Sequence, residues 1–468
     1  MPFLKQTYEN LLNSFSGDYR EIFIENSKNI LLRLVNGKVE TPDLNENKGF
    51  SVLSRTGNKE YFKAYAGLDN IENETLNFIK TFGLDCDLGN ADLHSLQGKK
   101  DVIVVNADLR SLQLKKEFSF SNYSIEKDGK RLGSYLEKLK ELLNSQPQIS
   151  SYTLNILLAH KEFIVANSNG IFVKDSNYYN NIYVILNGEK NGQNEEIFEK
   201  ITGTGIIEKL TYEEIEKACI KACEKLDEVL NGIPSPSGLM DVIIGNEAGG
   251  TIIHEAIGHG LEADLLNSSV YRDKLGQQVA APFINIIDEP IRNNLRGSYN
   301  FDHEGIESKK TYLIKNGILV SYLHSNKTAA LFETESTGHA RREAYYCPTL
   351  VRMGNTYLDK GTSKKEEIIS KIRNGIYVSQ MGGGQVNTVT GDFVFKVSYG
   401  YLIKDGKLTD IIRGANISGN GPQMLQNIKA ICDDLEHFDG GTCGKGQSMP
   451  VSDATPTILV ELKVTGIK

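Results

Sequence analysis

The residues of this chain best suited to chemistry form the segment His254-Glu255-Ala256-Ile257-Gly258-His259. Two imidazoles beside a carboxylate are groups that can bind a transition metal and move a proton. Zinc-peptidase helices commonly place their two histidines four residues apart, on one face of the helix. Here the spacing is five residues, which separates the two side chains by roughly 140° on a regular helix.

The two histidines can share one metal only if the helix between them is irregular. A π-bulge, which inserts one extra residue into a turn, would restore their alignment, and such bulges occur at functional sites. We expect it at Gly258, because a glycine has no Cβ to clash there. The alternative is a pair of unrelated helix histidines with a surface glutamate, and the spacing alone does not decide between the two.

A catalytic zinc ion usually takes three protein ligands, so a third donor is needed. The best candidate is Cys443, in the segment Gly-Gly-Thr-Cys-Gly-Lys-Gly that begins at residue 440. Its glycines allow the backbone to approach a ligand closely, and Lys445 could favour the thiolate. The alternative interpretation of Cys443 is a small buried residue in a glycine-rich turn.

Other polar residues give weaker signals. Glu262 and Asp264 follow the second histidine and would either accept a hydrogen bond from a ligand histidine or end the helix. Cys219 and Cys223 are four residues apart on a predicted helix, so we expect them on its packed face. Histidines without paired spacing are expected to be surface or hydrogen-bonding residues, namely His303, His324, His339 and His437.

The elements that position these residues differ between the two halves of the chain. In the first half, apolar spacing predicts helices at 3–15, 70–81, 134–143 and 212–230. Alternation of apolar and polar residues predicts strands, including 21–35 with an interruption at Asn26-Ser27, and Asn36-Gly37 predicts a tight turn. The first half is therefore expected to be α+β, with hairpins on one sheet.

The segment NGIPSPSG at 231–238 marks a boundary, because it gathers glycine, proline and serine directly after the last predicted helix. Beyond it, dense glycine and alternating segments such as DFVFKVSYGYLIKDG predict sheets with tight turns. We predict a two-domain α+β chain, with a hairpin-rich amino-terminal domain at 1–235 and a sheet-rich carboxy-terminal domain at 236–468.

The 468 residues carry a net charge of −8, with 60 acidic and 52 basic side chains and no Lys/Arg-rich block. We expect no nucleic-acid partner, since phosphate binding needs a concentrated positive surface. No apolar run approaches the roughly 20 residues of a membrane span, and the first residues lack the pattern of a secretory signal. Six scattered cysteines give no disulfide framework, so we expect a cytoplasmic protein with reduced thiols.

Four segments together resemble the TldD/PmbA family of metallopeptidases, and in particular its metal-binding, TldD-type subunit. They are HEAIGHGLEAD, GGGQVNTVTGDFVF, GANISGNGPQML and GTCGKGQSMPV. The resemblance extends over nearly the whole chain, because NGKVE and GFSVLSRTG are similar, less specifically, to the family's amino-terminal domain. It implies that His254, His259 and Cys443 are zinc ligands and that Glu255 is the catalytic carboxylate.

The resemblance further implies a zinc-dependent peptidase of short or unfolded polypeptides that works as a dimer, with itself or with a metal-free, PmbA-like sister subunit. Glu255 would act as general base toward water activated by the metal. Tyr399 and His339 are candidates for the donor that stabilises the oxyanion, and the sequence does not select one. The alternative function is a regulatory or binding subunit of such a complex. Three protein donors plus a glutamate favour catalysis, since four protein ligands close a structural zinc site.

Overall fold

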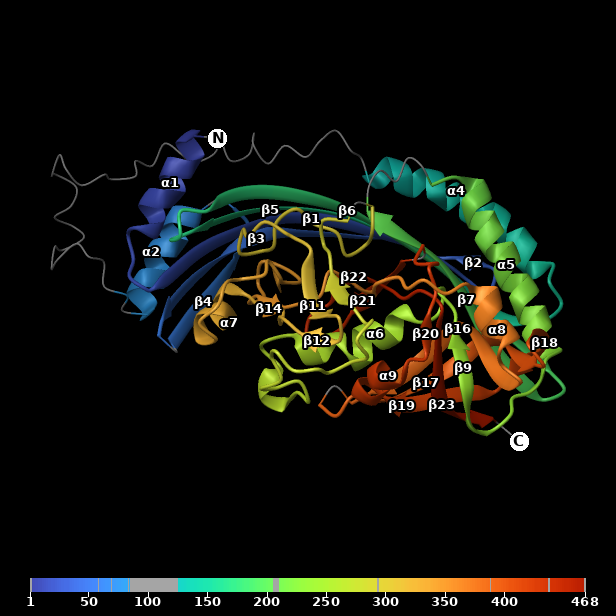
Figure 1. Cartoon of the computed structure of the whole chain (residues 1–468). Helices are drawn as coiled ribbons and strands as arrows, with labels where there is room; N and C mark the ends of the chain where they lie inside the picture. The colour runs from blue at the N-terminus through green and yellow to red at the C-terminus, as the bar shows by residue number, and fades with distance from the viewer. Residues whose placement is uncertain are drawn as a thin grey trace, which may run out of the picture.

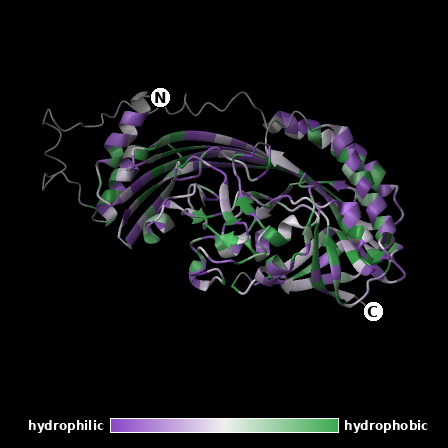
Figure 2. Ribbon diagram, viewed as in Figure 1, coloured by the Kyte–Doolittle hydropathy of each residue, from purple (hydrophilic) through white to green (hydrophobic). Residues whose placement is uncertain are grey.

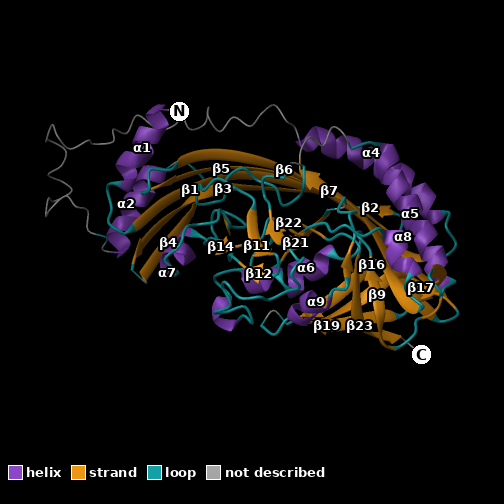
Figure 3. Cartoon of the chain, viewed as in Figure 1, coloured by secondary structure: helices purple, strands orange, loops and turns teal. Residues whose placement is uncertain are grey.

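The computed structural model of the chain describes residues 2–57, 59–68, 70–82, 84, 125–204, 210–292, 294–387, 389–436 and 438–466. Cys86 and His437 lie outside the described residues. Strands dominate the regular structure, as Figure 3 shows in orange. Among the residues described, no helix has both the length and the apolar character that crossing a membrane requires.

The amino-terminal half is built on one antiparallel sheet whose long strands bend into an arch (Figure 1). The order across it is β4-β3-β1-β5-β6-β7, with β2 paired to β1. Its strands are β1 (Tyr19–Val35), β2 (Lys38–Val39), β3 (Asp43–Thr56), β4 (Lys59–Ala66), β5 (Ile149–Asn167), β6 (Phe172–Lys190) and β7 (Gln193–Thr204). The turn predicted at Asn36-Gly37 is confirmed, since both residues have positive φ, 46° and 81°.

The side chains of β1 alternate between the two faces of this sheet. Successive side chains point to opposite faces, so Ile22 and Ile24 join the cluster under the outer helices while Phe23 packs on the inner face. The interruption predicted at Asn26-Ser27 is wrong, because β1 runs through both residues. Each of them is paired with β3 on one side and β5 on the other, and this double ladder outweighs the local turn preference.

Two helix pairs cover the ends of the outer face of the arch (Figure 1). They are α1 (Pro2–Leu12) with α2 (Ile71–Phe82), and α4 (Ile125–Asn144) with α5 (Tyr212–Leu230). Figure 2 shows hydrophilic and hydrophobic residues mixed along α4 and α5, whose apolar residues pack on β1, β5 and β6. Cys219 and Cys223 belong to this packed face, as predicted. Thr211 and Glu214 form a capping box that starts α5. All four predicted helices are confirmed, and α4 begins earlier than predicted.

The second half holds an eight-stranded sheet in the order β16-β9-β23-β19-β17-β18-β8, with β20 beside β23. Because β16 also pairs with β17, the strands from β16 to β17 close into a ring. The strands are β8 (Ile233–Pro234), β9 (Gly238–Ile244), β16 (Asn374–Val386), β17 (Asp392–Lys404), β18 (Lys407–Arg413), β19 (Ala415–Asn420), β20 (Ala430–Ile431) and β23 (Ile458–Gly466).

A six-stranded sheet, in the order β12-β11-β10-β15-β22-β21, lies between this ring and the arch (Figure 1). Its strands are β10 (Ile286–Asp288), β11 (Thr311–Lys315), β12 (Ile318–Leu319), β15 (Asn355–Leu358), β21 (Asp439–Cys443) and β22 (Met449–Ala454). β13 (Ala340–Arg341) pairs with β14 (Leu350–Val351). Short helices connect the strands: α6 (Gly250–Ala256), η4 (Gly258–Leu261), η5 (Leu266–Ser268), α7 (Asn326–Leu331), α8 (Lys365–Ser370) and α9 (Gly421–Asn427).

Each half of the chain has its own apolar core. The largest cluster of buried apolar residues draws its members from 242 onward. The clusters under the two helix pairs come mainly from residues up to 230, and Tyr399, Tyr401 and Ile411 of the second half also pack there. The sheet-rich α+β class is confirmed. The domain boundary at 235/236 stays a prediction, and β8, just before it, already pairs with β18.

Candidate metal centre

The two histidines lie on either side of a break in the helix. α6 ends at Ala256, and Ile257 leaves helical geometry with φ −127° and ψ −55° before the 3-10 turn η4 begins. The π-bulge predicted at Gly258 is therefore wrong, because the chain breaks and then tightens instead of widening. The break still brings the imidazoles of His254 and His259 together, with ring centroids 5.1 Å apart and ring planes at 88°.

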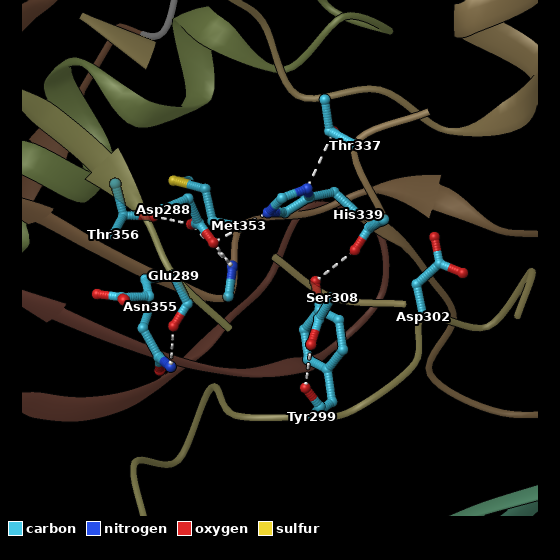
Figure 4. A network of polar contacts seen from close by, with 12 residues as sticks. Asp288, Glu289, Tyr299, Asp302, Ser308, Thr337, His339, Met353, Asn355 and Thr356 are labelled. Atoms are coloured by element: carbon cyan, nitrogen blue, oxygen red, sulfur yellow. Dashed lines mark hydrogen bonds and ion pairs between the residues drawn. The ribbon is translucent and has the colours of Figure 1, made fainter. Parts of the chain in front are cut away.

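The Met353 side chain packs closely against Gly258. A Cβ at this position would lie 2.2 Å from the sulfur of Met353. The next residue, Gly354, donates its N–H to the Asp288 carboxylate at 3.0 Å, and this carboxylate also accepts from His339 Nε2 at 3.0 Å. Figure 4 shows Met353 beside this buried pair. The segment 353–354 beside the turn between the two histidines is therefore held to the last residue of β10, Asp288.

Cys443 joins the histidines from a distant segment. It is the last residue of β21 and lies opposite Met449 of β22. Its sulfur is 3.3 Å from Nε2 of His259, and the donor atoms of His254, His259 and Cys443 all lie within 4.8 Å of one another. The three residues are buried, with exposed fractions of 2%, 6% and 6% in that order. The structure thus assembles the three donors that the sequence singled out.

Glu255 is the more exposed member of the group. Its side chain is 36% exposed, and its Oε2 lies 3.8 Å from His259 Nε2. The carboxylate therefore borders the buried donors on a side that solvent reaches. A general base that acts on water needs both this proximity and this access.

Glu262 holds His259 from behind. Its Oε2 accepts from Nδ1 of His259 at 2.7 Å, which leaves Nε2 facing Cys443. Glu262 also directly follows the last residue of η4. It therefore both accepts a hydrogen bond from His259 and ends this helical turn, which were the two alternatives for this residue. Lys445, expected to favour the thiolate, instead places its ammonium 3.1 Å from Glu262 Oε2 and 2.6 Å from Asp264 Oδ1. Asp264 is therefore part of an ion pair behind the donors.

The charges around the donors favour an ionised cysteine. Burial alone would raise the pKa of the Cys443 thiol, but the two neighbouring histidines lower this pKa to about 4. Burial would likewise lower the pKa of His259, but the Glu262 carboxylate and the Cys443 sulfur raise it to about 10. A thiolate is the form of cysteine that binds metal ions.

His254 provides the test of whether a metal fits. It is buried, and neither of its ring nitrogens has a hydrogen-bond partner among the described residues. A buried polar atom without a partner costs free energy unless a further group satisfies it. A metal ion bound by one nitrogen would do so, and a set of two imidazoles and one thiolate suits zinc. The residues present therefore fit the metal that the sequence predicted.

Neither candidate for the oxyanion donor is free to act. His339 is fully buried, and its ring nitrogens contact Thr337 Oγ1 and Asp288 Oδ1, each at 3.0 Å (Figure 4). The Tyr399 hydroxyl donates to Glu228 of α5 and lies 2.9 Å from the Tyr401 hydroxyl. The fold already uses these polar groups, so the structure gives no support to either suggestion.

The elements that carry the donors also line a cavity of about 280 Å³. Thr251 of α6 lies in its wall, and residues four apart on a helix share one face, so the cavity lies on the Glu255 side of α6. Asp439, the first residue of the strand that ends at Cys443, is also in the wall. Lys200 of β7 and Gly382 of β16 contribute from the arch and the ring. The cavity thus shares elements with the donors, although none of the three donors lines it.

The chain is similar in sequence and fold to known proteins. Residues 237–466 match the sequence profile of the PmbA/TldA metallopeptidase C-terminal domain. The zinc metalloprotease TldD homolog of Saccharolobus solfataricus is 30% identical over 350 residues, which cover 73% of this chain and 77% of that protein. The metalloprotease TldD homolog of Haemophilus influenzae is 40% identical over 236 residues, 50% of this chain and 49% of that relative.

The match with the Haemophilus influenzae protein thus spans about half the length of each chain. The crystal structure of TldE from Thermococcus kodakarensis has the same fold, with a TM-score of 0.69 and 18% identity over 100% of both chains. These matches place the chain in a family whose members are named metalloproteases. The chain belongs to the TldD/PmbA family of metallopeptidases.

Proposed function

We propose that this protein is a zinc-dependent peptidase that hydrolyses peptide bonds of short or unfolded polypeptides. The observation that carries the proposal is the meeting of two buried imidazoles and a buried cysteine beside the more exposed Glu255. His254, His259 and Cys443 would hold the metal, and Glu255 would be the general base. Three protein donors leave a position for water or substrate, which is the pattern of a catalytic zinc site.

Zinc held by these residues supplies Lewis acidity, which lowers the pKa of water and polarises a carbonyl. Glu255 takes the proton of the attacking water and passes it to the leaving amine, and its partial exposure gives the carboxylate access to both. Glu262 accepts from Nδ1 of His259 and so keeps Nε2 available as a donor atom. Cys443 adds the charge of a thiolate.

The substrate class and the assembly are part of the same proposal. A cavity of about 280 Å³ has room for part of an extended chain but not for a folded domain. We expect the active species to be a cytoplasmic dimer, either with itself or with a metal-free, PmbA-like sister subunit. Light scattering of the purified chain, alone and with such a subunit, measures the assembly. Full activity of a monomer on folded protein would contradict both parts of this expectation.

Two substitutions separate metal binding from chemistry. Cys443→Ala removes the thiolate, so zinc content and peptide cleavage should fall together. Glu255→Gln keeps the size of the side chain and all three donors, so zinc should stay near stoichiometric while the rate falls about 100-fold to 10,000-fold, as for loss of a general base. Elemental analysis and cleavage of an unstructured peptide measure the two effects, with the exposed Glu335→Gln as control.

Three outcomes would change the proposal. A wild-type rate in Glu255→Gln would exclude this residue as the base. Retained zinc and activity in Cys443→Ala would exclude the cysteine as a ligand. A wild-type protein that binds zinc and cleaves no peptide, alone or with a sister subunit, would favour the regulatory or binding subunit instead.

A further inference from the structure

A buried arginine closes the loop that carries Cys443. Arg352 is 1% exposed, and its guanidinium donates from Nη2 to the Cys443 carbonyl at 2.7 Å and from Nη1 to the Gln447 carbonyl at 2.6 Å. These two carbonyls are the ends of the loop 443–447. A single planar group therefore fixes the distance between the two ends.

Side chains of the loop hold it from outside, since Lys445 pairs with Glu262 and Asp264 and Gln447 donates to the Pro348 carbonyl at 2.8 Å, but its main chain is flexible by composition. Gly444 and Gly446 flank Lys445, and a Cβ at either glycine would meet no atom within 4 Å. Gly446 has a φ of +66°, a conformation that glycine adopts freely. Glycine also has the greatest backbone freedom of all residues, so this segment depends on outside contacts to hold one conformation.

A second buried arginine holds the strand just before the cysteine. Arg296 donates from Nε to the Gly441 carbonyl at 3.0 Å and from Nη2 to Thr442 Oγ1 at 3.2 Å. Its Nη1 donates to the Asn180 carbonyl on β6 at 3.3 Å. The end of β21 is thus tied to the arched sheet as well as to its own loop.

The same segment supports the histidine side of the donor set. Met353, next to Arg352, is the residue whose sulfur lies against Gly258 between the two histidines. Residues 352 and 353 therefore contact both the cysteine loop and the turn between the histidines. A shift in this short segment would move the Cys443 sulfur relative to the imidazoles of His254 and His259.

We propose that Arg352, assisted by Arg296, is a positioning residue of the metal centre, which fixes the main chain around Cys443 so that its sulfur meets the two histidines. This inference rests on the proposed metal site. Arg352 acts through backbone carbonyls and contacts none of the three donor atoms. Lysine cannot replace it, because a single ammonium group lacks the planar fork that reaches two carbonyls in fixed directions.

Metal binding by the full chain, without any assay of activity, tests this role. Zinc affinity is measured by competition with a chelator, and Co²⁺ binding by the sulfur-to-cobalt charge-transfer band that reports a bound thiolate. In Arg352→Lys we expect zinc affinity to fall about 10-fold to 100-fold, as for other groups that orient a ligand, and the band to weaken. Arg296→Lys should show a smaller change in the same direction. Arg33→Lys, at a half-exposed ion pair with Glu40, is the matched control.

A double-mutant cycle distinguishes positioning of Cys443 from a general loss of structure. If Arg352 acts through the cysteine, Arg352→Lys should not weaken metal binding further when Cys443 is already alanine. An equal loss in both backgrounds, or an unchanged affinity and band in the folded Arg352→Lys protein, would overturn the inference. If Arg352→Lys does not fold, the same cycle with Arg296→Lys decides. A wild-type protein without the thiolate band would refute the metal site itself.

Discussion

At the scale of single residues, Glu262 is a carboxylate that is fully buried and still ionised. Burial would raise its pKa, but His259, Lys445 and Arg352 lower the pKa to about 2. The short contact with His259 Nδ1 then fixes the orientation of the imidazole. This arrangement of a carboxylate, a histidine and a metal position is common at zinc sites, where the outer group tunes the ligand.

Glu262→Gln should therefore weaken zinc binding without removing a ligand. The amide is neutral and accepts a weaker hydrogen bond from His259, so we expect zinc affinity to fall about 10-fold to 100-fold. Chelator competition measures this change. Glu255→Gln is the matched control, because the same substitution seven residues earlier should leave zinc affinity close to that of the wild type. Equal affinities in the Glu262→Gln and wild-type proteins would contradict the role.

The sequence contained enough information to single out the donors and Glu262, which supports His259, but not the arginines that support Cys443. His254, Glu255 and His259 are adjacent in a short motif, and Cys443 lies among glycines, so residue type and spacing point to them. Arg296 and Arg352 belong to no motif, and they reach β21 only because distant segments pack side by side. Long-range contacts of this kind depend on the tertiary fold and leave no periodic signal in the sequence.

At the scale of elements, local patterns predicted the helices well and the break after Ala256 poorly. The capping box of Thr211 and Glu214 is local, so the start of α5 was predictable. The geometry between the two histidines instead depends on Met353, about a hundred residues away, which occupies the space beside Gly258. The unbroken β1 strand has the same explanation, because two neighbouring strands pair with Asn26 and Ser27.

Gly258→Ala tests the contact that shapes this turn. The added methyl would lie 2.2 Å from the Met353 sulfur, so one of the two segments must move. Overpacking of this kind costs about 1–3 kcal/mol in the free energy of unfolding. Urea unfolding of Gly258→Ala, Met353→Ala and the double variant measures the coupling. We expect the double variant to be less destabilised than the sum of the single changes, and strict additivity would contradict the contact.

At the scale of the whole molecule, charged groups join the arch to the second half. Arg342 is fully buried and pairs with Glu21 of β1, and its guanidinium lies 4.2 Å from the ring centre of Phe23. Lys161 of β5 donates to the Arg342 carbonyl at 3.2 Å. Each half also has its own apolar cluster, and a small cluster of Phe23, Phe163 and Val165 with Tyr345 packed against it lies beside these charged groups.

Acid should lower the stability of the molecule in part through His324. This buried side chain has a pKa lowered to about 4, by burial and by the charge of His339. Between pH 6.5 and about 4 the unfolded chain therefore binds a proton that the folded chain does not, so the free energy of unfolding falls as the pH falls through this range. Urea unfolding at several pH values should give a shallower dependence for His324→Gln than for the wild type. Identical slopes would show that this histidine does not contribute.

The buried pair of Arg342 and Glu21 should couple the two halves of the chain. Arg342→Met leaves the Glu21 carboxylate buried without its partner, and breaking a buried pair in this way costs about 3–5 kcal/mol. The double variant Arg342→Met/Glu21→Leu removes both charges and should recover much of this loss. Arg33→Met, at the exposed pair with Glu40, should cost about 0–1 kcal/mol.

Urea unfolding followed by circular dichroism and by tyrosine fluorescence measures the free energies. In Arg342→Met we also expect the unfolding transitions seen by circular dichroism and by fluorescence to separate, because the two halves lose the charged pair that links them. A single coincident transition, with a loss of unfolding free energy like that of Arg33→Met, would show that the apolar contacts suffice.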